Sequence, residues 1–96
     1  MNDLELLQRY SETGCEAAFV ELVKRYVDLV YSAAMRQVSG DAHLAQDVTQ
    51  SVFIDLARKA ASFSSRTILT GWLYTSTRFA AWAATIWREV SFKGPL

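Results

Sequence analysis

DAHLAQDVTQSVFIDLARKA, residues 41–60, repeats apolar side chains at steps of three and four residues. This spacing predicts an amphipathic helix, because residues three and four apart lie on the same side of an α-helix. A neighbouring face of the same helix carries Asp47, Gln50 and Ile54, so it is polar at one end and apolar at the other. The residues expected to be buried are Leu44, Ala45, Val48, Val52 and Leu56.

Helical periodicity also covers residues 3–12 and 15–38. We expect the first of these helices to begin with Asp3 as its N-cap and to stop at Gly14, since glycine readily adopts the left-handed conformation that ends helices. Ser39-Gly40-Asp41 then ends the second helix and caps the next one, which predicts a short antiparallel turn. The apolar stripe of 15–38 consists of Phe19, Leu22, Val23, Tyr26, Val30, Ala33 and Ala34.

Residues 61–70 lose the helical period and are rich in hydroxyl side chains, so we expect a loop there. Thr70 is the expected N-cap of a fourth helix over 71–89. No segment alternates apolar and polar residues as a half-buried strand does. The sequence therefore predicts an all-α, three- to four-helix bundle that forms a single domain over residues 1–96. The fourth helix is expected to point Trp72, Leu73, Ser76, Ala80 and Ala83 inward.

Composition excludes several classes of protein. Of the 96 residues, 51% are apolar, which is too many for a disordered chain, and the single Cys15 excludes a disulfide scaffold. The most apolar stretch, residues 79–87, is nine residues long, whereas a membrane span needs about twenty. The acids near the N-terminus do not fit a signal peptide. We expect a soluble, cytoplasmic protein with no membrane partner.

Charge is balanced overall but unevenly placed along the chain. Residues 1–55 hold nine acids and four bases, whereas residues 56–96 hold six bases and one acid. A basic half suits a polyanion and an acidic half repels it, so two different partners are one interpretation. The alternative is that the two halves interleave in the fold and the asymmetry disappears.

Residues suited to catalysis are scarce. His43 is the only histidine, and neither a glycine-rich phosphate loop nor a metal-binding pair of cysteines or histidines occurs. A surface position for His43 and a small packed side chain at Cys15 explain both residues. We therefore expect a binding module and not an enzyme, with no metal and no cofactor.

Several motifs, taken in order, resemble region 2 of an extracytoplasmic-function (ECF) sigma factor of the sigma-70 family. The similarity runs from about residue 3 to about residue 81. Each motif is weak alone, but their order and spacing together are specific. The motifs are Ala18-Phe19 with Leu22 and Arg25-Tyr26, Gly40-Asp41, Ala45-Gln46-Asp47-Val48-Thr49-Gln50-Ser51-Val52-Phe53, and Gly71-Trp72-Leu73-Tyr74 with Thr77-Arg78.

This resemblance implies a helical domain that binds the clamp helices of the RNA polymerase β′ subunit. The stretch 47–56 matches the polymerase-binding helix of the family, so Asp47 and Gln50, with Ile54, would face the β′ coiled coil. Two polar groups beside one apolar side chain can form hydrogen bonds while burying a small apolar area. The alternative is that Asp47 and Gln50 only solvate the helix.

The resemblance also implies recognition of the minus-ten promoter element as melted non-template DNA. The loop 61–70 and the helix after it match the segment that holds an extruded base, and stacking aromatic rings with basic phosphate contacts suit a single strand. The candidates are Phe63, Arg66, Arg78 and Phe79. The alternatives are that Phe63 plugs the core beneath the loop and that both arginines are ordinary surface charges. Trp72 is expected in the core.

The chain departs from the family pattern in three respects. Phe79 stands where many relatives have Asn, the apolar stretch 82–96 replaces a basic run, and we expect no second domain like region 4 within these 96 residues. These departures leave a rival hypothesis, a sigma-derived interaction module without promoter recognition. Such a module would sequester polymerase or an anti-sigma partner, or form a homo-oligomer through Trp82 and Trp87.

Overall fold

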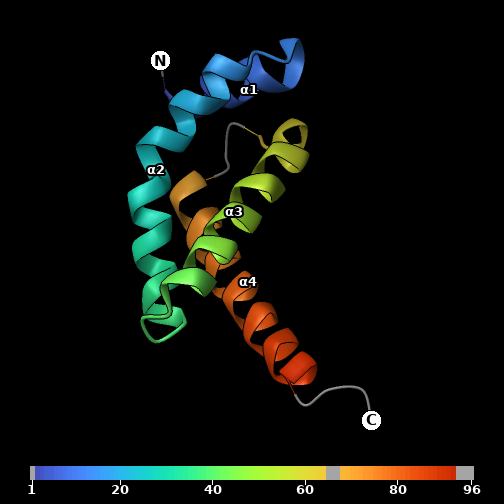
Figure 1. The fold of residues 1–96 in the computed structure, drawn as a ribbon. Helices are drawn as coiled ribbons and strands as arrows, with labels where there is room; N and C mark the ends of the chain where they lie inside the picture. The colour runs from blue at the N-terminus through green and yellow to red at the C-terminus, as the bar shows by residue number, and fades with distance from the viewer. Residues whose placement is uncertain (1, 65–67, 93–96) are drawn as a thin grey trace.

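The computed structural model describes residues 2–64 and 68–92, which form four α-helices, one 3-10 helix and no strand (Figure 1). The prediction of an all-α bundle is confirmed. Arg66, one of the candidate DNA-binding residues, lies outside the described residues. The helices are α1 (Asp3–Thr13), α2 (Glu16–Gln37), α3 (Ala42–Lys59), η1 (Ala60–Ser62) and α4 (Leu69–Phe92).

The start of α1 differs from the prediction. Asn2, and not Asp3, is the N-cap, because the Asn2 side chain accepts a hydrogen bond of 2.8 Å from the backbone N–H of Glu5. Asp3 instead accepts hydrogen bonds from Arg25, at 3.0 Å, and from the Tyr26 hydroxyl, and so joins α1 to α2. The predicted stop at Gly14 is confirmed, since its φ of 69° is left-handed and its N–H bonds to Tyr10.

The turn between α2 and α3 is as short as predicted. Ser39 and Gly40 both have positive φ, and the N–H of Gly40 bonds to the carbonyl of Met35 at 2.9 Å. Asp41 is the N-cap of α3 and accepts a hydrogen bond of 3.0 Å from the N–H of Leu44. The two helices consequently run side by side in opposite directions (Figure 1).

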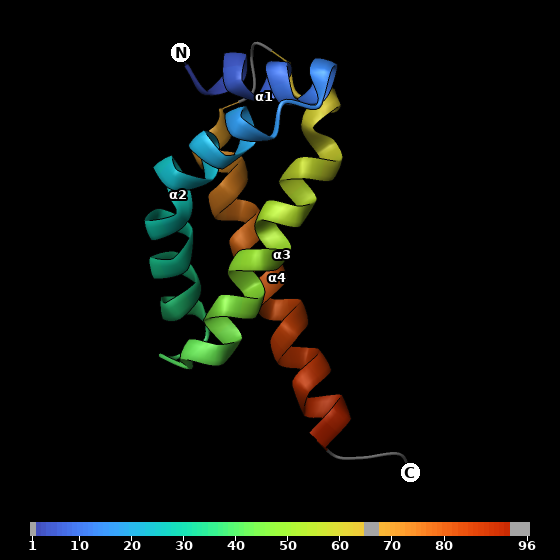
Figure 2. The same cartoon turned by 45° about the horizontal axis from the view of Figure 1, so that its top comes forward.

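The core lies where α2, α3 and α4 pack against one another, and α1 covers one end of it together with η1 (Figure 2). Phe53 is buried as well, which the periodicity of residues 41–60 did not indicate. Thr77 is fully buried, and its hydroxyl donates to the carbonyl of Leu73, so no unpaired polar atom enters the core. The most completely buried side chains are Leu7, Leu22, Val30, Val48, Val52, Leu56, Leu73 and Thr77.

Helix α4 begins earlier and buries a different stripe than predicted. It starts at Leu69, which is buried, so Thr70 lies inside the helix and is not its N-cap. The buried stripe runs through Leu73, Thr77 and Ala81, whereas Ala83, expected to point inward, is exposed. The reason is that Ala83 stands two residues after Ala81, which places it on the other side of the helix from the buried stripe.

The contact between Asp3 and Tyr26 predicts an alkaline loss of stability. The hydrogen bond to Asp3 and partial burial raise the pKa of Tyr26 to about 12, so this contribution is complete below pH 10 and is lost as the pH approaches about 12. We expect Tyr26→Phe to lower the free energy of unfolding by about 1 kcal/mol at neutral pH, because the charge-assisted hydrogen bond is lost. Denaturant titrations followed by circular dichroism measure both effects.

The matched control for this test is Tyr31→Phe, on the same helix. The difference in unfolding free energy between the wild type and Tyr26→Phe should shrink from pH 10 upward, and at neutral pH it should exceed the difference for Tyr31→Phe. A Tyr26→Phe difference that stays constant up to pH 12 would contradict the assignment.

Candidate functional site

Three side chains predicted to share one face of α3 are exposed together. Asp47, Gln50 and Ile54 lie along the outer side of the helix, while Val48 and Val52 hold its inner side in the core. Ile54 is an apolar side chain left 53% exposed, so it adds apolar surface between the two polar side chains and the end of the helix. We call Asp47, Gln50 and Ile54 the α3 ridge.

An apolar groove of about 420 Å³ runs along one side of the α3 ridge, between α3 and α2. Gln50 and Ile54 form one wall, and Phe19 and Val23 of α2 form part of the other. The sequence pattern grouped Phe19 and Val23 with the buried stripe of α2, but the structure leaves both half-buried at the surface. The groove gives the ridge an apolar surface that a partner helix can cover.

A second groove, of about 570 Å³, lies on the other side of the ridge, between α3 and α4. Ile54 lines this groove too, so its side chain stands between the two hollows. Phe79 and Trp87 line the α4 wall, and Asp55 and Arg58 add charge on the α3 wall. The sequence did not show that a residue of the candidate polymerase surface and a candidate DNA-binding residue share one groove.

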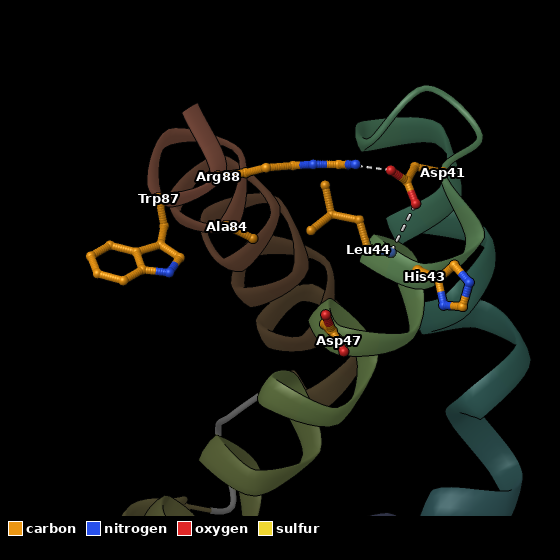
Figure 3. Close-up of a pocket in the computed structure, with 7 residues that line it drawn as sticks. All are labelled: Asp41, His43, Leu44, Asp47, Ala84, Trp87 and Arg88. Atoms are coloured by element: carbon orange, nitrogen blue, oxygen red, sulfur yellow. Dashed lines mark hydrogen bonds and ion pairs between the residues drawn. The ribbon is translucent and has the colours of Figure 1, made fainter. Parts of the chain in front are cut away.

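A third groove, of about 690 Å³, separates the start of α3 from the last turns of α4 (Figure 3). The Arg88 side chain crosses it and forms an ion pair with Asp41 (Figure 3). The hydrogen bonds from Arg88 and from the N–H of Leu44 hold the pKa of the Asp41 carboxyl below its usual value. Asp47 lines the same groove, while the Trp87 indole points away from Asp41.

Phe63, a candidate for base stacking, packs against Trp72. The two ring centroids are 5.2 Å apart in an edge-to-face arrangement, and both rings are half-buried against the core. Trp72 therefore contributes to the core at its edge, as the sequence indicated. This packing favours the structural interpretation of Phe63, although part of its side chain is accessible to solvent.

Arg78 and Phe79 are both exposed on α4. Arg78 lies one helical turn from Tyr74 on one side and from Trp82 on the other, and both of these aromatic side chains are exposed. The ring of Phe79 is 6.0 Å from that of Trp82. A cation between aromatic rings suits a nucleic-acid strand. The sequence analysis did not single out Tyr74 and Trp82 for this role, although their four-residue spacing from Arg78 is a signal that could have found them.

The structure does not bring all of the candidate DNA-binding residues into one cluster. Phe63 packs against Trp72, near the start of α4. Phe79 follows Trp72 by seven residues, which is about 10 Å along the helix axis. A single strand running along α4 can span this distance.

The acidic and basic halves of the chain also interleave, because Arg88 of the basic half pairs with Asp41 of the acidic half.

Two further observations concern metal binding and membranes. Within residues 2–64 and 68–92, no three His, Cys, Asp or Glu side chains gather closely enough to hold a metal ion. No helix in the part of the chain that the structure describes is long and apolar enough to cross a bilayer.

The comparisons with known proteins agree with the resemblance seen in the sequence. The sigma-70 region 2 family matches residues 22–82. The ECF RNA polymerase sigma factor SigE of Mycolicibacterium smegmatis is 38% identical over 71 residues, which are 71% of this chain and 27% of that protein. The chain thus spans little more than a quarter of this relative. No solved structure matches the chain.

The family match begins at Leu22 in α2, takes in all of α3 and ends at Trp82 in α4. It therefore includes the α3 ridge and the exposed Arg78 and Phe79, whereas Phe19 of the first groove and Trp87 of the second lie outside it. On this match and on its four-helix architecture, the chain belongs to the sigma-70 region 2 family.

Proposed function

We propose that this chain is a transcription initiation module that binds core RNA polymerase through the α3 ridge. The observation that carries the proposal is the exposure of Asp47, Gln50 and Ile54 in one line beside two grooves. A coiled coil such as the β′ clamp helices has the elongated shape that these grooves fit. Polar contacts at Asp47 and Gln50 would set its register, and burial of Ile54 would add affinity.

The same proposal assigns the exposed face of α4 to the minus-ten promoter element in its melted, single-stranded form. Arg78 would neutralise a phosphate and Phe79 would stack on a base, with the accessible edge of Phe63 contributing nearer the loop. Arg66, which precedes α4 in the sequence and lies outside the described residues, would add a second cation. This function needs no catalytic group or cofactor, and it places the chain in the cytoplasm with the polymerase.

A second candidate function is supported by the exposed Trp82 and Trp87. A sigma-derived interaction module would use these rings to bind a protein, with no promoter recognition, and would sequester polymerase or an anti-sigma partner. The two functions differ in one measurable property, which is affinity for a minus-ten-like single strand.

Binding to polymerase is tested by replacing Asp47 and Gln50 together with Ala. We expect at least a tenfold loss of affinity for bacterial core polymerase, because two polar contacts at a partly desolvated interface contribute about 1.4 kcal/mol or more. The matched control is Asp28→Ala with Gln37→Ala, which removes the same two side-chain types from the exposed side of α2. Retention of wild-type affinity by the ridge variant, with helical content unchanged, would rule out this surface.

Strand binding is tested by separating charge from stacking. Fluorescence anisotropy with a minus-ten-like single strand, repeated over a range of salt concentrations, should show that Arg78→Glu lowers the salt slope by about 0.7, the contribution of one phosphate contact. Phe79→Ala should weaken binding by about 1 to 3 kcal/mol and leave the slope unchanged. Arg36→Glu, on exposed α2, is the control for net charge. Equal binding by all four proteins would rule out Arg78 and Phe79 as strand contacts, and no binding by the wild type would favour the second candidate function.

A further inference from the structure

The C-terminal half of α4 carries an apolar face that no other part of the described chain covers. The C-terminal part of α4 extends beyond the bundle (Figures 1 and 2), and the face lies largely away from the buried stripe of Leu73, Thr77 and Ala81. At its margin, Phe79 and Trp87 also line the open groove between α3 and α4. A continuous apolar face of this kind marks an interaction surface. Its large side chains are between 43% and 71% exposed, and they are Phe79, Trp82, Ile86, Trp87 and Val90.

The spacing along the middle of this face is symmetric. Phe79, Ala83, Ile86 and Val90 follow one another at steps of four, three and four residues. If two copies of α4 lie antiparallel about a two-fold axis between residues 84 and 85, Phe79 faces Val90 of the second copy and Ala83 faces its Ile86. Each larger side chain then meets a smaller one, which is the complementarity that an interface between identical chains needs.

The charges on α4 fit the same antiparallel arrangement. Residues 69–92 contain three charged side chains, and one of them, Arg88, points back to the bundle and pairs with Asp41. The other two, Arg78 and Glu89, are eleven residues apart, so they lie on one flank of the apolar face. Antiparallel pairing brings Arg78 to within about 3 Å, measured along the axis, of Glu89 in the second copy, and symmetry forms this contact twice.

We propose that two copies of this chain pair through this face of α4 as an antiparallel, two-fold symmetric dimer. The face is apolar along its centre, has opposite charges on one flank and is complementary to itself, which favours a second copy over a nucleic acid. Three aromatic side chains exposed by about two thirds offer roughly 300 to 500 Å² per chain, below the ~800 Å² per partner of a standard interface. The dimer is therefore reversible and concentration-dependent.

Pairing also covers Arg78 and Phe79, the residues assigned above to the promoter strand. A paired chain cannot hold a strand through them, so self-association would keep the chain from DNA until it dissociates. This consequence rests on the proposed function, whereas the dimer itself does not.

The test of the dimer is sedimentation velocity of the full chain over a range of concentrations. The wild type should shift from monomer to dimer, and Ile86→Glu should remain a monomer, because it places like charges in the middle of the face. Leu29→Glu, at a similarly exposed apolar position on α2, should dimerise as the wild type does. A wild type that is monomeric throughout, or an Ile86→Glu protein that still dimerises, would overturn the proposal, with circular dichroism confirming that each variant is folded.

Exchange of the two flank charges tests the antiparallel geometry. Arg78→Glu and Glu89→Arg should each raise the dissociation constant of the dimer at least threefold. The double exchange, Arg78→Glu with Glu89→Arg, should return the dissociation constant to the wild-type value. Failure of the double exchange to restore dimerisation would overturn the antiparallel pairing. Strand binding measured at concentrations where the chain is a monomer reports on the proposed function alone, so its failure is distinguishable from failure of the dimer.

Discussion

Helix α3 packs against α2, α4 and η1 through one buried stripe, and this packing fixes what the helix presents to solvent. Val48, Val52 and Leu56 are removed from water, each contributing about 1.5 to 3 kcal/mol. A helix cannot rotate without breaking these contacts, so Asp47, Gln50 and Ile54 point outward whatever their polarity. The ridge is thus a consequence of the core behind it.

Carboxylates near two helix ends hold the remaining elements to this centre. Asp3 joins α1 to α2 through Arg25 and Tyr26, and Asp41 both caps α3 and pairs with Arg88 of α4. In each case one side chain satisfies two donors, so two of the nine acids in residues 1–55 are engaged in contacts within the fold. The acidic and basic halves of the sequence are therefore not separate surfaces, because the ion pair of Asp41 with Arg88 joins one to the other.

Helix α4 changes role along its length. Its first half supplies Leu73, Thr77 and Ala81 to the core, and its second half, of similar apolar composition, passes beyond the bundle and faces water. Arg78 and Phe79 lie where the two halves meet. Binding of a strand and pairing of two chains therefore use overlapping surfaces, so the two events compete for one set of side chains.

The sequence by itself determined the helices, the stop at Gly14, the capped turn at Asp41 and the exposed line from Asp47 to Ile54, because helix periodicity and capping are local. Only the tertiary structure decided that Asp3 bonds to Arg25 and Tyr26 of α2 and does not cap α1, that Phe53 is buried while Phe19 is half-exposed, and that Ala83 faces outward. These outcomes depend on which helix passes over each residue and where a neighbouring helix ends. They are set by contacts between segments that are distant in the chain, and the spacing of residues within one segment does not reveal such contacts.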